Sequence, residues 1–440
     1  MSARSASKGR RGSKRGLALA LVCALFSAVP AAAQTPLERA EHLLRARQPA
    51  AALAQVEALT ARTAAERERI LWVAAAAHIQ RKAPATALPL LEALVSADPA
   101  SARYRFALGR VLLDLGRTDR ARHHLERALD GGLEPDAQLI ALEDLERIER
   151  TRKWSGHFRF ALAPDSNPAA RTSDRQVEIG GLPFTLGESA RAQPGTGLDI
   201  GGSLHHGHWI TNRLRVSAGG HASALLYRDQ ALTDIRIGAV GRLDWQADAH
   251  RKFTVSLRAG TRWRGGKPYS DEIGLNLAFA RRIGPATTLR LEAGRTVIRH
   301  DSFASADGHS DSAAVQVRHG ITPALSVHAT AGVIRTQARA ASESGTHVLA
   351  GIGADLTFPG GLMAGLSASV GRDVRDGPEP LFGTVRRDVS YGLGARFSHR
   401  DVRLGGFAPV VTLSYKGRRS TLAIHDYDRF GASLGLTRAF

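Results

Sequence analysis

The sequence predicts a protein of two parts: helical repeats, followed by an antiparallel outer-membrane β-barrel of about fourteen strands. Three observations predict this fold. Residues 34–153 have the apolar spacing of helices, whereas many segments of residues 154–440 alternate apolar with small or polar residues, as strands do. The connections between those segments alternate in length. The last segment, from Phe430 to the aromatic Phe440, alternates in the same way and resembles the closing strand of such a barrel.

The first 33 residues have the pattern of a signal peptide. A basic stretch precedes an apolar run over 17–29, and the Ala-Ala-Ala sequence at 31–33 predicts cleavage before Gln34. The apolar run is too short to serve as a spanning helix. The single cysteine of the chain, Cys23, lies in this segment, so we expect a mature protein without disulfides or thiolate metal sites.

The positive charge is distributed unevenly. The chain has a formal net charge of +19, of which residues 34–153 carry +2 and residues 154–440 carry +11. The excess of basic residues therefore lies mainly in the predicted barrel, where it affects which molecules can pass through the lumen. It does not point to nucleic acid, which an exported barrel would not meet.

One stretch of residues 34–153 has the spacing of the tetratricopeptide repeat, whose period is about 34 residues. Its large–Gly pair and small inter-helix positions are Leu108, Gly109, Leu112, Gly116, Ala121, Leu125 and Ala128. The unit before it matches through Ala87, Leu91 and Pro99, and a looser unit spans residues 36–59. One further amphipathic helix is expected over 135–153, with Leu139 and Ile148 on its apolar face.

Stacked helix pairs leave a concave surface that binds peptides, and the first helix of each repeat lines it. The positions that match this surface, called the groove residues below, are Arg69, Trp72, Arg103, Phe106, Arg110 and Asp114. Two alternatives stay open: the two aromatic residues could be ordinary inter-helix core, and the charged residues could belong to a solvated helix face.

Residues 253–263 illustrate the predicted strands, since Phe253, Val255 and Leu257 alternate with Ser256 and Arg258. Arginines on the polar side of several strands fit a wet lumen better than a packed soluble core. The predicted lumen positions are Arg258, Arg262, Arg290 and Arg396. The alternative for each arginine is an ion pair with a neighbouring lumen acid, such as Glu292 or Asp355.

The connections fall into two classes. Short ones are expected near residues 208–212, 247–250, 284–287, 320–323 and 359–361. Longer ones are expected near residues 164–194, 299–311, 337–345, 373–384 and 418–426. Outer-membrane barrels have short periplasmic turns and longer outer loops. An even number of strands then places both barrel ends, and the helical repeats, in the periplasm.

Two segments resemble a known family. The sequence GHFRFALAPDSNPAA at 156–170, which contains Pro-Asp-Ser-Asn, resembles the start of the barrel domain in surface lipoprotein assembly modifiers (Slam proteins). Residues 407–421 and 427–440 are similar to the final hairpin of that family. The positions that match the family motifs are Asp165, Asn167 and Phe440.

Members of this family move lipoproteins, and in some cases soluble haem- or metal-scavenging proteins, across the outer membrane. The resemblance implies an outer-membrane location, with the N-terminal domain in the periplasm and a surface lipoprotein or secreted protein as client. The implied partners also include outer-membrane lipids, periplasmic chaperones and the barrel assembly machinery. No catalytic residue, metal site or cofactor is expected.

Three other functions fit the sequence less well. An exopolysaccharide exporter also joins periplasmic repeats to a barrel, but it tends to have many more repeats and an aromatic or acidic lining. A plain porin would not need repeats. A barrel enzyme would need a triad, and the neighbouring Ser398 and His399 do not form one that the sequence can place.

Overall fold

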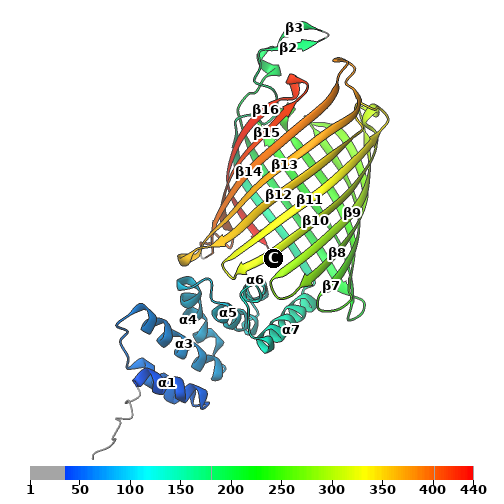
Figure 1. The fold of residues 1–440 in the computed structure, drawn as a ribbon. Coiled ribbons are helices and arrows are strands. Elements are labelled where there is room, and N and C mark those ends of the chain that lie inside the picture. Colours follow the sequence, from blue (N-terminus) through cyan, green and yellow to red (C-terminus); the bar gives the residue numbers. More distant parts are fainter. Residues whose placement is uncertain (1–34, 180, 401, 440) are drawn as a thin grey trace, which may run out of the picture.

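The computed structural model describes residues 35–179, 181–400 and 402–439, where seven helices precede a closed barrel (Figure 1). The expected signal peptide, with Cys23, and the motif residue Phe440 lie outside the described residues. The helices are α1 (Pro36–Arg45), α2 (Pro49–Glu57), α3 (Ala64–Gln80), α4 (Pro84–Ala97), α5 (Ala102–Asp114), α6 (Thr118–Leu129) and α7 (Pro135–Thr151).

No helix in the described ranges is both long and apolar enough to cross a membrane.

Side-chain caps fix where several helices begin. Thr35 and Glu38 form a capping box at the start of α1, and the hydroxyl groups of Thr63 and Ser101 accept backbone N–H bonds at the starts of α3 and α5. Gly109 is required where α5 meets α6, because a Cβ atom there would lie 2.8 Å from Cγ of Leu125. The predicted tetratricopeptide-like helix pairs are confirmed.

The apolar core of the protein lies within the helices. Its larger cluster extends from α3 to α7 and includes Leu91, Leu94, Leu108, Leu112 and Leu125. The helix expected over 135–153 is present as α7, and its apolar face is as predicted except at Leu139. Leu139 is 59% exposed, whereas Ile148 is buried. Leu142 and Leu145 pack against the same core, where α7 meets α5 and α6.

The barrel has fourteen antiparallel strands in one closed ring, in the order β1-β16-β15-β14-β13-β12-β11-β10-β9-β8-β7-β6-β5-β4. Its first seven strands are β1 (Trp154–Asp165), β4 (Gly195–Trp209), β5 (Leu214–Tyr227), β6 (Asp234–Gln246), β7 (Arg251–Arg264), β8 (Lys267–Ile283) and β9 (Thr287–His300). The others are β10 (Gly308–Thr322), β11 (Leu325–Ala338), β12 (Gly345–Thr357), β13 (Leu362–Pro378), β14 (Val385–His399), β15 (Ala408–Ser420) and β16 (Tyr427–Ala439).

The predicted alternation of faces is confirmed. Large apolar side chains cover the outer wall, among them Leu257 at 55% exposure, Ile352 at 66% and Leu393 at 59%. Neighbours in sequence, such as Arg258, point to the opposite side, because successive side chains of a strand alternate. An exposed apolar wall around a polar interior is the arrangement of a barrel in lipid.

The predicted phase of the connections is also confirmed. The predicted short turns, such as 247–250 between β6 and β7, lie at the end where the helices are, and the predicted long loops lie at the other end (Figure 1). One connection at the helical end is longer, because β14 ends at His399 and β15 begins at Ala408. One short turn lies on the long-loop side: Gly265 and Gly266, both with positive φ, join β7 to β8 directly. Strands β2 (Gln176–Ile179) and β3 (Leu182–Thr185) form a separate hairpin in the loop after β1.

The end of α6 is fixed to the base of β10 and β11. Asp130, which is 5% exposed, lies 2.8 Å from Nη2 of Arg318 on β10. Arg127 donates a hydrogen bond of 3.0 Å to the hydroxyl of the fully buried Ser326 on β11. Gly131 lies against the turn between these strands, with no room for a side chain.

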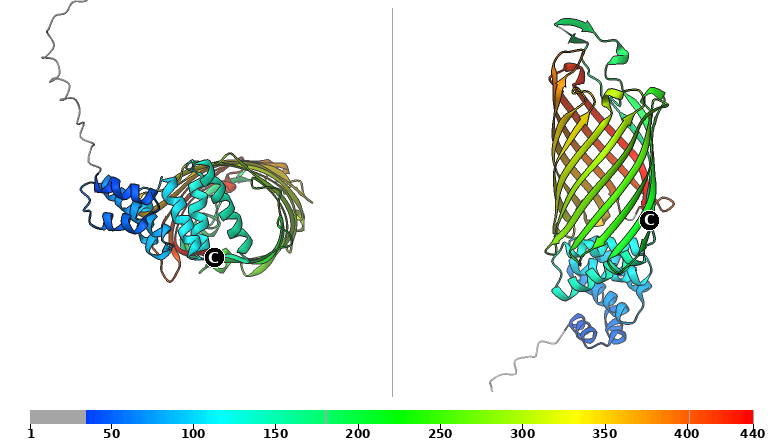
Figure 2. Two further views of the ribbon diagram at one scale, coloured as in Figure 1. Left: turned by 90° about the horizontal axis from the view of Figure 1, so that it is seen from below. Right: turned by 90° about the vertical axis from the view of Figure 1, so that its right-hand side faces the viewer.

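The end of α7 is fixed to the base of β4 and β5. Glu149 pairs with Arg215 on β5, and its carbonyl oxygen accepts a hydrogen bond of 3.1 Å from Nε1 of Trp209 on β4. Strands β5 and β10 are five positions apart in the ring of fourteen. The hairpin of α6 and α7 therefore spans the mouth of the barrel as a bar, which the view from below shows (Figure 2).

Two neighbouring histidines of α6 lie among arginines. His124 is 2% exposed, and burial lowers its pKa well below the usual value. Burial, together with Arg105 and Arg127, lowers the pKa of His123 to about 3. Arg105 is fully buried and donates a hydrogen bond of 2.7 Å to the carbonyl oxygen of Pro99. Both histidines are therefore neutral at pH 7.

We predict that Asp130→Asn loosens the helices from the barrel. Removing one partner of a fully buried ion pair costs about 3–5 kcal/mol, and the partial exposure of Arg318 reduces this to about 2 kcal/mol. The undocked population should then rise about thirtyfold, which faster proteolysis of the segment between α7 and β1 in nanodiscs would measure. Glu126→Gln, an exposed position of the same helix, is the control. Equal cleavage of the two variants would contradict the prediction.

We predict that the helical region loses stability as the pH falls. A histidine in an unfolded chain has a pKa of about 6.5, whereas that of His123 is about 3 in the folded chain. The folded state then binds fewer protons, so stability is complete above pH 6.5 and declines below it. Proteolysis within α5 and α6 should therefore be faster at pH 5 than at pH 7.5. The double variant His123→Gln with His124→Gln should be cleaved at similar rates at the two pH values.

Candidate functional site

The barrel closes where its first strand meets its last, and this seam is paired incompletely. Along one edge, β1 pairs with β4 at all twelve of its residues. Along the other edge, and within the described residues, it pairs with β16 at seven. Pairing runs from His157–Ala439 to Leu162–Leu434 and resumes at Asp165–Gly431 without a change of register.

Pro164 accounts for the gap. The N–H of Ser166 donates to the carbonyl oxygen of Phe430 at 2.9 Å, so its backbone faces β16. Backbone groups of a strand alternate between its two neighbours, so the backbone of Pro164 faces β16 as well. Proline has no N–H. It therefore cannot make the ladder bond to Ala432, and pairing at residues 163 and 164 is lost.

Side chains of the Asp-Ser-Asn sequence hold the seam just above this gap, and we call this set of contacts the latch. Nε of Arg429 on β16 lies 2.6 Å from a carboxylate oxygen of Asp165. The hydroxyl of Ser166 accepts a hydrogen bond of 2.8 Å from the N–H of Phe430. Nδ2 of Asn167 donates to the carbonyl oxygen of Asp428 at 3.2 Å.

Asn167 also shapes the long loop that follows β1. Its side chain is almost completely buried, at 1% exposure. Nδ2 donates to the carbonyl oxygen of Arg171 at 2.7 Å, and Oδ1 accepts from the N–H of Arg171 at 3.0 Å. One amide thus ties the loop to itself and to β16. Of the three family-motif positions, Asp165 and Asn167 lie in the latch, and Phe440 lies outside the described residues.

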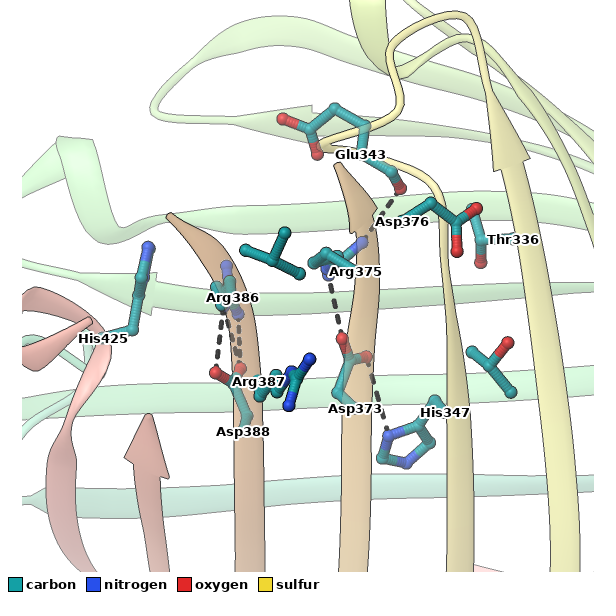
Figure 3. A network of polar contacts seen from close by, with 12 residues as sticks. Thr336, Glu343, His347, Asp373, Arg375, Asp376, Arg386, Arg387, Asp388 and His425 are labelled. Atoms are coloured by element: carbon teal, nitrogen blue, oxygen red, sulfur yellow. Dashed lines mark hydrogen bonds and ion pairs between the residues drawn. The ribbon is translucent and has the colours of Figure 1, made fainter. Parts of the chain in front are cut away.

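A belt of ion pairs lines the lumen wall near the long loops, on strands that lead to the seam (Figure 3). Asp373 on β13 lies 3.1 Å from Arg375 and 3.7 Å from His347 of β12. On β14, Arg386 lies 2.7 Å from Asp388, which is 3% exposed. Arg386 and Asp388 are joined by charge-assisted hydrogen bonds, whereas Arg375 and Asp373 are close in charge but not hydrogen-bonded.

Three groove residues come together on α3 and α5. The guanidinium carbon of Arg103 lies 3.8 Å from the ring centre of Trp72, a cation–π contact. Tyr104 lies 5.4 Å from the same ring and donates a hydrogen bond to Glu68, and burial with this bond raises its pKa. Arg69 pairs with Glu41 of α1 at 2.9 Å. The three first helices thus share one polar and aromatic surface.

The other groove residues lie further along α5. Phe106 is partly buried and packs against the helical core, 5.9 Å from the guanidinium of Arg110. Arg110 pairs with Asp144 of α7 at 3.4 Å. Asp114 is exposed at the end of α5. Their roles in binding a client stay predictions.

Two of the four predicted lumen arginines are paired. Arg262 pairs with Asp234, and Arg290 with Glu292. Within the described part of the chain, neither Arg258 nor Arg396 has a carboxylate at ion-pair distance. Both lie on the inner face, next in sequence to outward-facing apolar side chains.

Sequence reasoning missed most of the contacts that join distant parts of the chain. Asp130–Arg318, Glu149–Arg215 and Asp165–Arg429 connect residues that lie far apart in sequence. The family resemblance singles out the Pro-Asp-Ser-Asn sequence, but no local pattern predicts its contacts with β16. Proline within a predicted strand is the signal that could have located the gap.

Residues 154–440 match the family model described as surface lipoprotein assembly modifier, and residues 78–142 match a tetratricopeptide repeat model. The family match covers the whole described barrel, including the latch. No curated protein sequence matches the chain.

Several solved structures match part of this chain at low identity. The outer membrane channel DcaP of Acinetobacter baumannii is 8% identical with a TM-score of 0.41, over 65% of this chain and 96% of that one. A FadL homologue of Pseudomonas aeruginosa is 10% identical with a TM-score of 0.36, over 68% and 91%. A bacterial polysaccharide outer membrane secretin is 11% identical with a TM-score of 0.36, over 65% and 98%.

We predict that Asn167→Ala weakens the seam. The variant removes the three hydrogen bonds of the buried Asn167 amide to Arg171 and Asp428, each worth about 0.5–1.5 kcal/mol. The folded barrel should unfold at a lower temperature, as the heat-dependent mobility shift on gels would show. Asn276→Ala is the matched control, because Asn276 faces the lumen on β8 and its side chain makes no hydrogen bond within the described residues. A similar shift in both variants would count against the latch.

Proposed function

The chain belongs to the surface lipoprotein assembly modifier family, and from that premise we propose that it delivers lipoproteins across the outer membrane to the cell surface. The observation that carries the proposal is the family match over the whole barrel, 154–440, together with helical repeats fixed below its mouth. A related secreted protein is a second kind of client within the same proposal.

The helical repeats hold the client, or a chaperone that brings it, at the periplasmic mouth. Trp72 and Arg103 offer an aromatic face and a cation on α3 and α5, and Glu68 and Glu41 frame them. Such a surface suits an extended segment with apolar and acidic side chains. Because the bar of α6 and α7 lies across the mouth, a client on this surface is held next to the lumen.

The lumen favours acidic segments of the client. Arg258 and Arg396 carry charges that no described carboxylate neutralises, and basic residues outnumber acidic ones in 154–440. A positively charged passage with low-dielectric walls attracts negative segments. The paired arginines, Arg262 and Arg290, stiffen the wall instead.

The remaining partners follow from the same role. Outer-membrane lipids surround the apolar wall, and the barrel assembly machinery inserts it. We propose no catalytic step, since transport of a polypeptide along this path needs binding and release only.

The test is removal of the protein from its host, followed by comparison of surface-exposed and secreted proteins. We expect one or more lipoproteins to disappear from the surface, while surface polysaccharide stays unchanged. Complementation with Arg103→Glu should restore about a tenth of the delivery, because the charge reversal removes the cation–π contact with Trp72. Arg67→Glu, an exposed position on the opposite side of α3, should restore it fully. Changed polysaccharide with unchanged lipoproteins would favour an exporter instead.

A further inference from the structure

A lipid-anchored client poses a topological problem for a closed wall. If the polypeptide crosses through the lumen and its acyl chains finish in the outer leaflet, the bond that links them must cross the barrel wall. An uninterrupted ladder of backbone hydrogen bonds prevents this crossing. The wall therefore has to open along one seam at least once in each delivery.

The seam between β1 and β16 has the fewest paired positions of any junction in the described barrel, and its ladder has a gap. The ladder between β13 and β14 is also interrupted, between Val374 and Pro378, but it has fourteen paired positions. Within the described residues, pairing is absent at Ala163 and Pro164 of β1. Every other pair of neighbouring barrel strands is joined by at least eleven paired positions. Above the gap, one pair of residues and the backbone bond from Ser166 to Phe430 remain, and the side chains of the latch supply the other contacts. So few bonds can part without unravelling a strand.

The outer wall has a recess at the height of the gap. Its volume is about 590 Å³. Its apolar part is formed by Pro164, Pro194, Phe430 and Ala432, and its polar part by Thr196 and by Asp165 and Ser166 of the latch. Phe430 is 54% exposed on the lipid-facing side. The recess thus joins the gap to the region where the outer leaflet lies.

The inner side of the gap carries no bulky group. The inward positions of β1 and β16 at this height are Ala161, Ala163, Ser433 and Gly435. A Cβ atom on Gly435 would lie 2.5 Å from Cβ of Ala161, so the two backbones approach closely here. On other strands the inward positions hold arginine, histidine and carboxylate side chains, such as Arg258 and His328.

We propose that the seam opens laterally at the Pro164 gap and that the acyl chains of the client leave the lumen there, passing through the recess into the outer leaflet. This rests on the proposed function and deepens it, because it names the route and the part of the client that uses it. Acyl chains are expelled from a lumen lined by charged groups and are stable in the recess and the leaflet. The polypeptide itself leaves through the long-loop end.

A disulfide across the gap tests the route. Ala163 and Ser433 face each other there at the register of the neighbouring pairs, and both point inward. Ala163→Cys with Ser433→Cys would lock the seam in an oxidant and release it in a reductant. The matched lock is Ala314→Cys with Gly332→Cys on β10 and β11, also an inward pair, where a Cβ on Gly332 would lie 3.3 Å from Cβ of Ala314.

Delivery of a lipoprotein is measured with both locks, oxidised and reduced, and with the same client made without its lipid anchor. We expect the oxidised gap lock to lower surface delivery of the anchored client at least tenfold, with recovery on reduction and little effect on the unanchored form. Equal delivery by the two oxidised locks would overturn the lateral route and leave the proposed function standing. If wild-type protein delivers neither form, the proposed function fails.

Amide hydrogen exchange tests whether the seam opens in the absence of a client. In nanodiscs that hold the full chain, amides of 161–166 and 431–434 should exchange at least tenfold faster than those of 313–318 in a continuous part of the wall. Ala163→Cys with Ser433→Cys, oxidised, should abolish the difference. Equal protection of both regions in the wild-type protein would overturn the proposal, whatever the delivery assay shows.

Discussion

Closure of the sheet is the constraint on which the rest of this structure depends. Within lipid there is no water to satisfy an unpaired N–H or C=O group, so a spanning sheet must have no free edge. Here thirteen of the junctions have at least eleven paired positions each, and the last, between β1 and β16, has seven within the described residues. Pro164 removes one donor from that junction, and Asp165, Ser166 and Asn167 compensate with side-chain bonds. Ring closure therefore depends on a short sequence at the rim as well as on backbone pairing.

Local patterns made most of the barrel predictable. The row from Phe253 to Trp263 alternates because of strand geometry alone, so its faces, and those of its neighbours, could be assigned without the fold. The pairing of Arg290 with Glu292 was foreseeable too, since residues two apart share a face of a strand. The apolar face of α7 was predictable too, except at Leu139. Periodicity places Leu139 on that face, but the packing of α7 against α5 and α6 leaves it exposed.

Contacts between distant segments could not be predicted in this way. Whether Asp165 meets Arg429, or Asp130 meets Arg318, depends on the strand order and on the register of the whole ring. Hydrophobic periodicity carries no information about either. The groove residues lie between these cases. Repeat spacing placed them on first helices, but the contact of Arg103 with Trp72 and the pairing of Arg110 with Asp144 arise from packing among α3, α5 and α7.

The bar formed by α6 and α7 has a consequence for how the molecule is built. Its two ends bind strands that are five positions apart in the ring, Asp130 at β10 and Glu149 at β5. Both attachments can be satisfied together only when these two strands have the separation of the finished ring. An unfinished sheet, still curling, holds at most one of them. The helical region can therefore form both attachments only after the barrel has reached its final width.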